Sequence, residues 1–434
     1  MNYKTNYFFL LVLIYLLISC KDSESKQAQS LSKRGAISST AMVVSARSEA
    51  SQIGSDILKK GGNAFDAMMA TEMALAVTYP YAGNLGGGGF MVFRLANGDV
   101  GSLDYREKAP LASSRDMYLD EKGEVIENKS TMGAFSVGVP GTIAGIFAAH
   151  EKLGKLPVPE VLQPVIDLAT KGYVITEKQQ ARFNNFDSIF RVVNGKQILY
   201  SNQSKVGDTL KNLKLAETLK RIAQNGKDEF YKGETGKLLV NYLNEKGGII
   251  TLEDIEKYEA KWRDPIIFNY KDLRIISMSP PSSGGICLAQ IMKMIEPYDL
   301  KSYGHNSLKS IQVITEAERR AYADRSYFLG DPEFVEIPVK TLMSDVYLND
   351  RMKDFSFEKA TPSDSISYGK IVGYESNETT HYSIAMEGSQ ACLCTCGRHL
   401  FYLSYQRLSP GLIKLNHTAI LQEQRSQSGS VCSF

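Results

Sequence analysis

The stretch "NLGGGGFMVFRLANGDVGSLDYRE", residues 84–107, decides how the chain builds its sheet. Two runs of β-branched, aromatic and other apolar residues, at 90–95 and 100–105, flank the dipeptide Asn97-Gly98. Asn and Gly tolerate the positive φ angles of tight turns, so Asn-Gly between two such runs is a strong hairpin signal. The sequence therefore predicts a β-hairpin over residues 90–105.

Four consecutive glycines, at 86–89, precede the first predicted strand. Glycine-rich loops hold phosphates on backbone N–H groups, but a P-loop also needs a Lys-Ser or Lys-Thr pair and leads into a helix. This run lacks that pair and leads into a strand. A close approach of two backbones, which a side chain would block, explains the glycines better.

Two helices are expected upstream of the hairpin. Apolar residues recur at helical spacing from 48 to 60, and Gly61-Gly62 supplies a stop. Asn63 is a good N-cap for a second helix at 64–77. That second helix is rich in Ala and Met and apolar on most faces, so it is expected to be buried.

Downstream of the hairpin, helices and strands continue to mix. Expected are helices at 142–153, 159–171, 213–224, 236–245 and 308–327, a capping box formed by Thr251 with Asp254, and a strand at 273–279. The order shows no regular βαβ alternation. This favours a layered α+β architecture over a doubly wound parallel sheet.

Composition narrows the classes of partner. The chain has 434 residues, is 43% hydrophobic, and carries 50 Lys and Arg against 48 Asp and Glu, for a net charge of +2. That length and hydrophobicity allow a large core. The near-neutral balance gives no electrostatic reason to expect nucleic acid as a partner. Small polar solutes are the expected ligand class.

The first 35 residues differ from the rest. A short polar start with Lys4 precedes the apolar run "FFLLVLIYLLI" at 8–18, and "LISC" ends at Cys20. This is typical of an export signal at 1–19 with lipidation of Cys20, followed by a polar tether at 20–35. A signal peptide cut elsewhere, with an incidental cysteine, is the alternative. Either way we expect a bacterial cell-envelope protein, in the periplasm or on the outer surface, and lipidation would anchor it to a membrane.

Asp104 and Arg106 lie two residues apart on the second predicted strand, and hence on one face of the sheet. An arginine there can bind a substrate carboxylate through two parallel hydrogen bonds, or it can pair with a neighbouring acid at the strand end. Spacing alone favours the second, structural interpretation, because most charges near strand ends serve solubility.

Other catalytic and metal-binding patterns are weak. The tail contains "CLCTC" at 392–396 and His399, but alternating cysteines do not have the spacing of a tetrahedral zinc site, so no metal is predicted. A G-x-S-x-G nucleophile elbow is missing, since "GVPGTIAG" at 138–145 has no central serine.

The stretch "ESNETTHYSI", residues 375–384, contains Thr379 and Thr380 before His381. A threonine hydroxyl is a poor nucleophile unless a base lies beside it, and a free α-amine can be that base for its own side chain. Thr379 would gain such an amine only if the chain were cut directly before it. From these residues alone, the start of a β-strand is the favoured interpretation.

Six stretches of the sequence, taken together, change this interpretation of Thr379. They are "GGNAFDAMMATEMALAVTYPYAGNLGGGGFM" (61–91), "LDYREKAP" (103–110), "GVPGTIAG" (138–145), "PPSSGGI" (280–286), "EAERRAYADRSYFLGDPEF" (316–334) and "ESNETTHYS" (375–383). In content and order they resemble the γ-glutamyltranspeptidase family, over essentially all of the chain from Ala36 to about Ala385. The resemblance implies an N-terminal nucleophile hydrolase fold, a four-layer αββα sandwich made as one precursor and cut into two subunits.

The resemblance also implies roles for particular residues. Thr379 matches the nucleophile, so the cut would fall between Glu378 and Thr379, with a large subunit at 36–378 and a small subunit starting at 379–386. Arg106 matches the arginine that binds the donor α-carboxylate, which reverses the structural interpretation. No catalytic role is implied for Thr380 or His381.

The implied donor is glutathione or another γ-glutamyl compound, and the acceptor is water, an amino acid or a dipeptide. The cleaved small subunit would remain a partner of the large one. The resemblance implies no metal or organic cofactor.

Residues 387–434 do not match the family. The helper threonine, the asparagine, the Ser-Ser pair and the Gly-Gly pair of the oxyanion hole cannot be placed there, and from 391 onward there is one acidic residue, Glu423, against four basic ones. This composition favours a frame-shifted end. It leaves two alternatives open: an inactive envelope lipoprotein that binds γ-glutamyl ligands through Arg106, and a glutaryl-amide acylase of the same superfamily.

Overall fold

A computed structural model describes residues 38–196, 198–371 and 395–396. The chain divides into two compact units, Met1–Met42 and Val43–Phe434, and every helix and strand below belongs to the second. Helices and strands are mixed along this unit, which confirms the α+β class.

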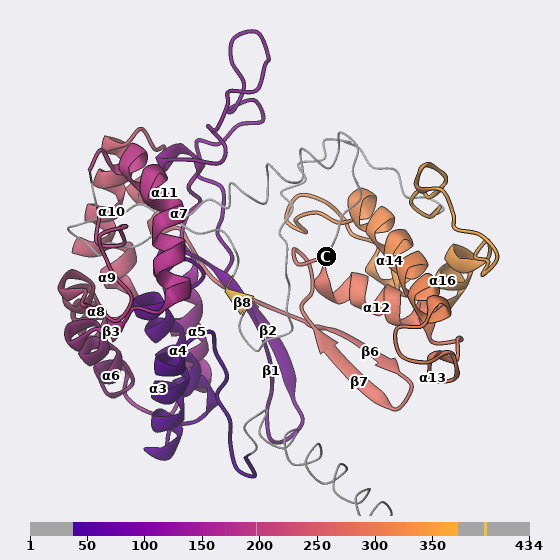
Figure 1. Cartoon of the computed structure of the whole chain (residues 1–434), viewed down its shortest axis with the longest axis horizontal. Helices are drawn as coiled ribbons and strands as arrows, with labels where there is room; N and C mark the ends of the chain where they lie inside the picture. Colours follow the sequence, from indigo (N-terminus) through magenta and orange to yellow (C-terminus); the bar gives the residue numbers. More distant parts are fainter. Residues whose placement is uncertain (1–37, 197, 372–394, 397–434) are drawn as a thin grey trace, which may run out of the picture. The chain divides into compact units, whose positions relative to one another are not determined.

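The predicted hairpin forms the centre of a four-stranded sheet (Figure 1). Strands β1 (Gly89–Arg94) and β2 (Val100–Asp104) pair antiparallel, in the register Phe90↔Asp104 to Arg94↔Val100. The sheet order is β5-β2-β1-β8, with β5 at Lys261–Arg263 and β8 at Thr395–Cys396. Both predicted strands end one residue early at the C-terminal side. The turn starts at Leu95 because its N–H donates to the Asp99 carbonyl at 2.7 Å, and Gly98 takes a positive φ of 94°.

Strand β5 carries Trp262, the single tryptophan of the chain. Trp262 pairs with Leu103 of β2 and contacts Phe93 of β1 edge-to-face, with ring centroids 6.1 Å apart. The Lys152 ammonium lies 4.2 Å from the centroid of the indole ring. These contacts join β5 to the hairpin and to helix α5 (Thr142–Leu153).

The two helices predicted before the hairpin are present as α3 (Ser48–Lys59) and α4 (Ala64–Thr78). Asn63 caps α4 as expected: its side chain accepts from the Phe65 and Asp66 amides, and the Asp66 carboxylate accepts from the Asn63 amide at 2.7 Å. Helix α4 packs against α3, α5 and α6 (Val158–Lys171), so its largely apolar surface is buried.

The helices predicted downstream are also confirmed, within one or two residues at their ends. They are α5, α6, α8 (Leu213–Asn225), α10 (Glu234–Glu245) and α14 (Leu308–Phe328), and Thr251 with Asp254 forms the capping box of α11 (Leu252–Glu256). Helices α7 (Glu177–Asn194), α9 (Lys227–Tyr231), α12 (Gly284–Ile295), α13 (Leu300–Tyr303), α15 (Val339–Leu342) and α16 (Asp345–Met352) were not predicted.

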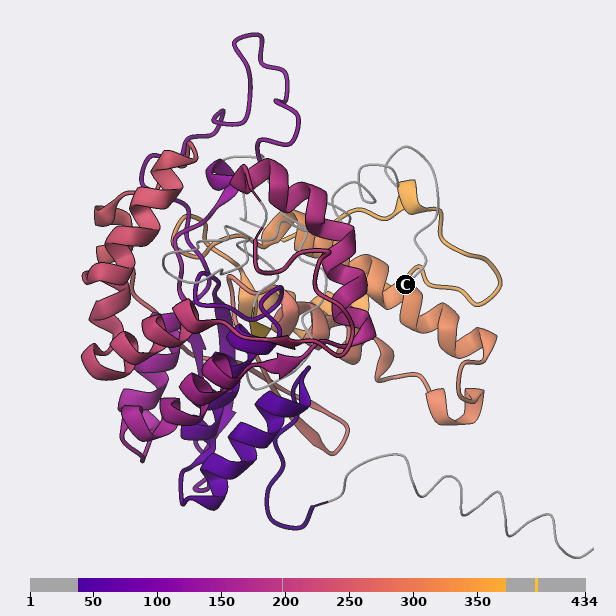
Figure 2. The same ribbon diagram turned by 60° about the vertical axis from the view of Figure 1, so that its left-hand side comes forward.

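The part of the chain after residue 264 has a hydrophobic cluster of its own. The hairpin of β6 (Ile266–Tyr270) and β7 (Leu273–Ser277) and the helices α12, α14 and α16 contribute the buried residues Ile266, Ile286, Val313, Ala317 and Leu348. Helix α14 packs against α12, and the two lie side by side in Figures 1 and 2. Short strands β3 (Tyr173–Val174) and β4 (Thr209–Leu210) form a separate pair. Within the described ranges, no helix has both the length and the apolar character to span a bilayer.

Candidate functional site

Arg106 lies directly after β2. The sequence placed it on the strand with Asp104, but β2 ends at Asp104. The backbone pairing runs one residue further, because Tyr105 and Gly89 exchange hydrogen bonds of 2.9 and 3.2 Å. Arg106 follows the last paired residue, so it lies where the chain leaves the sheet.

The Asp104 carboxylate fixes this exit. Its Oδ1 accepts from the Arg106 backbone N–H at 3.1 Å, and its Oδ2 accepts from Arg263 Nε at 2.8 Å, with Arg263 Nη2 also at 2.8 Å. The Arg263 guanidinium therefore binds Asp104 through two nitrogens, a geometry that strengthens and orients the pair. Arg263 in turn lies 3.5 Å from Glu333, which also pairs with Lys261. Asp104 thus positions the main chain of Arg106, and Asp104 itself is held by its ion pair with Arg263.

Two further contacts hold Arg106. The buried Tyr258 hydroxyl donates to the Arg106 carbonyl at 2.6 Å, and the Tyr258 ring stacks on Tyr231 with centroids 5.9 Å apart. The Arg106 guanidinium lies 5.8 Å from the centroid of the Phe90 ring. The main chain of Arg106 is therefore fixed at both its amide and its carbonyl, and its cationic group lies at the start of β1.

The glycine run packs against this segment at backbone distance. Gly87 accepts hydrogen bonds from the Gly141 and Thr142 amides at 2.8 and 3.0 Å. A Cβ on Gly88 would lie 2.6 Å from both the Glu107 nitrogen and the Tyr105 carbonyl oxygen. A Cβ on Gly141 would lie 1.9 Å from that same oxygen. The close-approach interpretation of the glycines is confirmed, and it joins the stretches at 86–89, 103–110 and 138–145 into one site.

Glu107 is a functional candidate that the sequence reasoning missed. Both of its carboxylate oxygens are buried, and neither has a hydrogen-bond partner of good geometry among the described residues. Burial raises the pKa of Glu107 to about 7, although the Arg106 charge and the backbone amides of Glu107 and Gly88 oppose that shift. The only signal in the sequence was its place beside Arg106. A carboxyl group such as that of Glu107, with a pKa near neutrality and next to the Arg106 guanidinium, can accept or donate a proton near pH 7, and in its ionised form it can bind an ammonium group.

The other predicted site residues lie outside the described residues. These are Thr379, Glu378 and Cys20, as well as Thr380 and His381. Of the predicted site residues, the described part of the chain therefore contains Arg106. Among the residues that the structure describes, no group of three or more His, Cys, Asp or Glu side chains is arranged to hold a metal ion.

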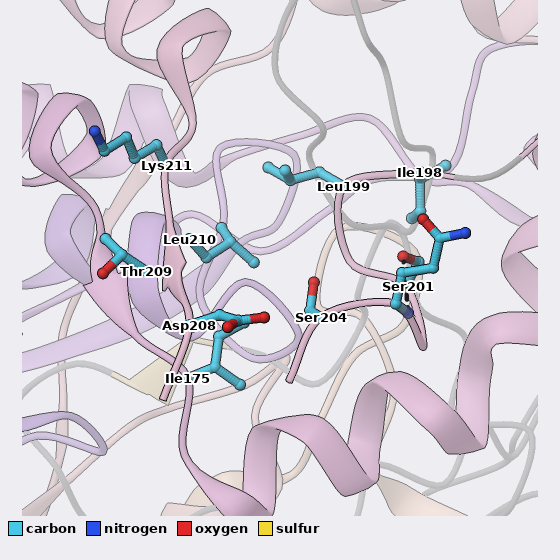
Figure 3. A pocket seen from close by; sticks show the side chains of 10 residues that line it. Ile175, Ile198, Leu199, Ser201, Ser204, Asp208, Thr209, Leu210 and Lys211 are labelled. Atoms are coloured by element: carbon cyan, nitrogen blue, oxygen red, sulfur yellow. Dashed lines mark hydrogen bonds between the residues drawn. The ribbon is translucent and has the colours of Figure 1, made fainter. Parts of the chain in front are cut away.

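A cavity of ≈ 680 Å³ lies away from these residues in sequence, around the β3–β4 pair (Figure 3). It is lined by Ile175, Ile198, Leu199, Ser201, Gln203, Ser204, Asp208, Thr209, Leu210 and Lys211. None of the predicted site residues lines it. Asp208 is exposed and accepts from the Lys205 amide at 2.8 Å, so this cavity holds no buried charge that would bind a substrate.

Comparison with known proteins gives one consistent family. The model described as Gamma-glutamyltranspeptidase matches residues 50–395, ten residues beyond the expected limit near Ala385. The "Glutathione hydrolase proenzyme" of Escherichia coli (strain K12) is 43% identical over 358 residues, which cover 82% of this chain and 62% of that protein. The chain thus spans about three fifths of the length of the curated relatives it matches.

Solved structures agree. The crystal structure of Helicobacter pylori gamma-glutamyltranspeptidase has a TM-score of 0.76 at 38% identity, covering 79% of this chain and 100% of that chain. Gamma-glutamyltranspeptidase from Pseudomonas nitroreducens complexed with L-DON has a TM-score of 0.70 at 40% identity, covering 76% and 99%. Both likenesses support the N-terminal nucleophile hydrolase fold. An "Acylase ACY 1 proenzyme" of Pseudomonas sp. (strain V22) is less similar, at 34% identity over 362 residues, 81% of this chain and 64% of that protein.

Proposed function

The chain belongs to the γ-glutamyltranspeptidase family, and from this premise we propose that it is the precursor of a γ-glutamyltransferase and glutathione hydrolase. One observation carries the proposal. Arg106, in the family stretch "LDYREKAP", is held by Asp104 and Tyr258 at the end of β2, where a planar guanidinium can bind the α-carboxylate of a γ-glutamyl donor.

The precursor is proposed to cut itself. Thr379 Oγ adds to the carbonyl carbon of Glu378, the C–N bond between the two residues breaks, and the nitrogen leaves as the α-amine of Thr379. Water then hydrolyses the Glu378 ester and returns the hydroxyl to Thr379. An internal threonine thereby becomes an N-terminal nucleophile with its own base.

The mature enzyme is proposed to use the same oxygen on the donor. The α-amine of Thr379 accepts the hydroxyl proton as Oγ adds to the γ-carbonyl carbon of glutathione, and that proton leaves with the departing amine. The γ-glutamyl ester then reacts with water in hydrolysis, or with the amine of an amino acid or dipeptide in transpeptidation. Arg106 keeps the glutamyl end in place, which makes the attack of Thr379 on the bound donor effectively unimolecular and keeps the ester carbonyl positioned for the incoming water or amine.

The location of the protein is proposed from the N-terminal residues alone. Residues 1–19 have the pattern of an export signal, Cys20 is the candidate lipidation site, and residues 20–35 are the tether. We expect the Cys20→Ala chain to lose its membrane-bound fraction, and partitioning between detergent and aqueous phases measures this loss. If Cys20→Ala protein stayed membrane-bound, we would abandon lipid anchoring at this residue.

A second candidate rests on the hypothesis that residues 387–434 are a frame-shifted end; the family match itself extends to residue 395, which leaves residues 396–434 unmatched. If residues 387–434 are a frame-shifted end, the chain as written is an uncut lipoprotein that binds γ-glutamyl ligands through Arg106. Nucleotide sequence past codon 386 decides between a restored frame and a natural stop.

The test of function starts with expressed full-length chain on a denaturing gel, with intact masses. A cut between Glu378 and Thr379, absent in Thr379→Ala, is expected, together with release of a chromogenic amine from a γ-glutamyl donor. An uncut chain that still binds glutathione saturably would support the lipoprotein alternative. A cut chain that releases amine from a glutaryl donor and none from a γ-glutamyl donor would point to the acylase.

A further inference from the structure

Residues 357–369, which lead toward the proposed cleavage junction, contain little regular structure. Their one helical element is the 3₁₀ turn Ser363–Ser365. They are nevertheless held along α14, the helix that contains the whole stretch "EAERRAYADRSYF" (316–328), part of a family motif with no role in the site described above.

Helix α14 binds the segment through side chains at successive turns. Arg319 donates from Nη1 to the Thr361 carbonyl at 2.7 Å and from Nη2 to Ser363 Oγ at 3.0 Å. The Tyr368 ring stacks on Tyr327, with centroids 3.5 Å apart and planes 5° from parallel. The segment therefore follows the helix from Thr361 to Tyr368.

The last anchor is an ion pair that we name the Asp324–Arg351 clasp. Asp324 is 1% exposed, and its Oδ1 accepts from the Gly369 backbone N–H at 2.8 Å and lies 3.1 Å from Arg351 Nη2. Its Oδ2 accepts from Gln290 Nε2 at 3.1 Å. The same Arg351 nitrogen donates to the Ser367 carbonyl at 2.8 Å. The clasp thus holds one amide and one carbonyl of the segment.

Gly369 fits this clasp because it has no side chain. A Cβ there would lie 2.3 Å from Tyr347 Oη and 2.8 Å from Arg351 Cδ. Arg351 is itself fixed by α14, because Arg320 Nε donates to the Arg351 carbonyl at 2.7 Å and Arg351 Nη2 donates to the Arg320 carbonyl at 3.1 Å. Arg320 is 2% exposed and pairs with Glu316 and Asp354.

Stability alone is a poor reason for this arrangement. Burial raises the pKa of Asp324 against the opposing charge of Arg351, so the ionised carboxylate is held at a cost. Buried ion pairs often contribute little net stability compared with apolar residues of the same volume, and they serve better to specify one geometry. The geometry that this pair specifies is the position of Gly369.

We propose that the Asp324–Arg351 clasp is a positioning element for self-cleavage, an inference that rests on the proposed cut before Thr379. The stretch from Gly369 to Glu378 reaches at most about 30 Å when fully extended. The Glu378 carbonyl and Thr379 Oγ belong to adjacent residues, so their reaction depends on the backbone conformation of the peptide that joins them. Fixing the start of the segment limits the conformations open to the chain that leads to this peptide, and so favours the reactive one. Asp324 and Arg351 touch neither reacting atom in this scheme; they act through the chain.

The test measures the rate of self-cleavage in freshly folded full-length chain, by gel and intact mass. Asp324→Asn keeps the size of the side chain and removes its charge, and we expect cleavage to slow at least tenfold, on the order expected for a misplaced reacting group. Gly369→Ala disturbs the clasp from the other side, because the added methyl group would collide with Tyr347 and Arg351, and it should slow cleavage to a similar extent. Arg351→Lys retains a charge but loses the guanidinium fork, so an intermediate rate is expected.

The matched control is Val313→Ala. Val313 is fully buried in the same helix and cluster, but it takes no part in the clasp. Val313→Ala should lower the melting temperature without slowing cleavage beyond twofold or so. In Asp324→Asn, the Gly369 amide should also exchange hydrogen faster, because it has lost its charged acceptor.

The outcomes separate the two claims. Cleavage of Asp324→Asn at the wild-type rate, or equal slowing in Val313→Ala, would overturn the clasp as a positioning element while leaving self-cleavage in place. A wild-type chain that is never cut would overturn the proposed self-cleavage and this inference together. Slow cleavage in the three clasp variants with a normal rate in Val313→Ala supports it.

Discussion

Asp104 and Asp324 do similar work in two regions of the molecule. Each accepts a backbone N–H on one oxygen, that of Arg106 in one case and of Gly369 in the other, and each pairs with an arginine distant in sequence. The two aspartates differ in the role proposed for the residue whose backbone N–H they bind. Asp104 fixes a residue whose own side chain is proposed to bind substrate, whereas Asp324 fixes the start of a segment whose far end is proposed to react.

One device, a carboxylate shared between an amide and a guanidinium, can therefore serve either ligand binding or chain positioning. The two regions should therefore respond to different measurements. Changes around Asp104 should alter glutathione affinity, and changes around Asp324 should alter the rate of self-cleavage.

Arg106→Ala removes the group that the Asp104 region is proposed to position. The dissociation constant for glutathione should rise about 100-fold, since a charge-assisted bidentate contact contributes about 2–3 kcal/mol. Calorimetric titration of the full chain measures it. The control is Arg94→Ala, which removes an exposed cation at the far end of β1 and should leave the dissociation constant unchanged. An equal loss of affinity in both variants would mean that Arg106 acts only through the net charge of the protein.

Gly88→Ala and Gly87→Ala form a matched pair. The new Cβ at 88 would meet backbone atoms at 2.6 Å that cannot move aside, whereas the nearest atom at 87 lies at an ordinary 3.5 Å. We expect Gly88→Ala to cost about 1–3 kcal/mol of the free energy of unfolding and Gly87→Ala much less. Thermal melting compares them. Equal melting temperatures would mean that the backbones around Arg106 are not closely packed.

Arg263→Met removes the partner of Asp104 while retaining a long apolar stem. Asp104 then keeps one amide donor, Arg106 becomes less restrained, and glutathione affinity should fall about tenfold, the equivalent of about 1.4 kcal/mol. The cleavage rate should stay normal, in contrast with the clasp variants. Arg274→Met, an exposed arginine of β7, is the control. Unchanged affinity in Arg263→Met would show that Asp104 needs no guanidinium to hold Arg106.

Glu107→Gln should change how stability depends on pH. Because the folded pKa is about 7 and the ordinary value is 4.5, the folded state binds the extra proton between these values. The contribution of Glu107 to the free energy of unfolding is therefore complete below pH 4.5 and is lost as the pH rises through 7. Glutamine removes that loss, so the gain in melting temperature should be larger at pH 8 than at pH 4. A gain independent of pH would contradict the raised pKa.

The sequence predicted those parts of the fold that depend on near neighbours. The Asn97-Gly98 hairpin, the Asn63 cap and the Thr251–Asp254 box are all local patterns, and each is present. Helix α7 was missed because polar residues dominate its sequence, and α12 was missed because it begins with Gly284-Gly285 after a proline-rich stretch that resembles a loop. Helix α7 buries Phe183 and Phe190, and α12 buries Ile286 and Ala289, so tertiary packing helps to stabilise both segments as helices.

For the site, the sequence supplied Arg106 and Thr379 only through the family resemblance, and the structure describes the first of them. Tyr258 and Arg263 approach Arg106 from more than 150 positions away. Such contacts leave no local pattern from which they could be predicted. Glu107 needed the knowledge that its oxygens are buried. The same limit applied to Asp324, whose amide partner Gly369 lies in a segment with no helix or strand period.

Trp262 gives the Asp104 region a built-in optical reporter. It is the one tryptophan in the chain, it precedes Arg263 in β5, and the Lys152 ammonium lies against its ring. Its fluorescence emission at selective excitation therefore comes from a single known position, next to the arginine that pairs with Asp104. Shifts in intensity or wavelength during a glutathione titration can follow this edge of the sheet without any added label, while the clasp on α14 stays spectroscopically silent.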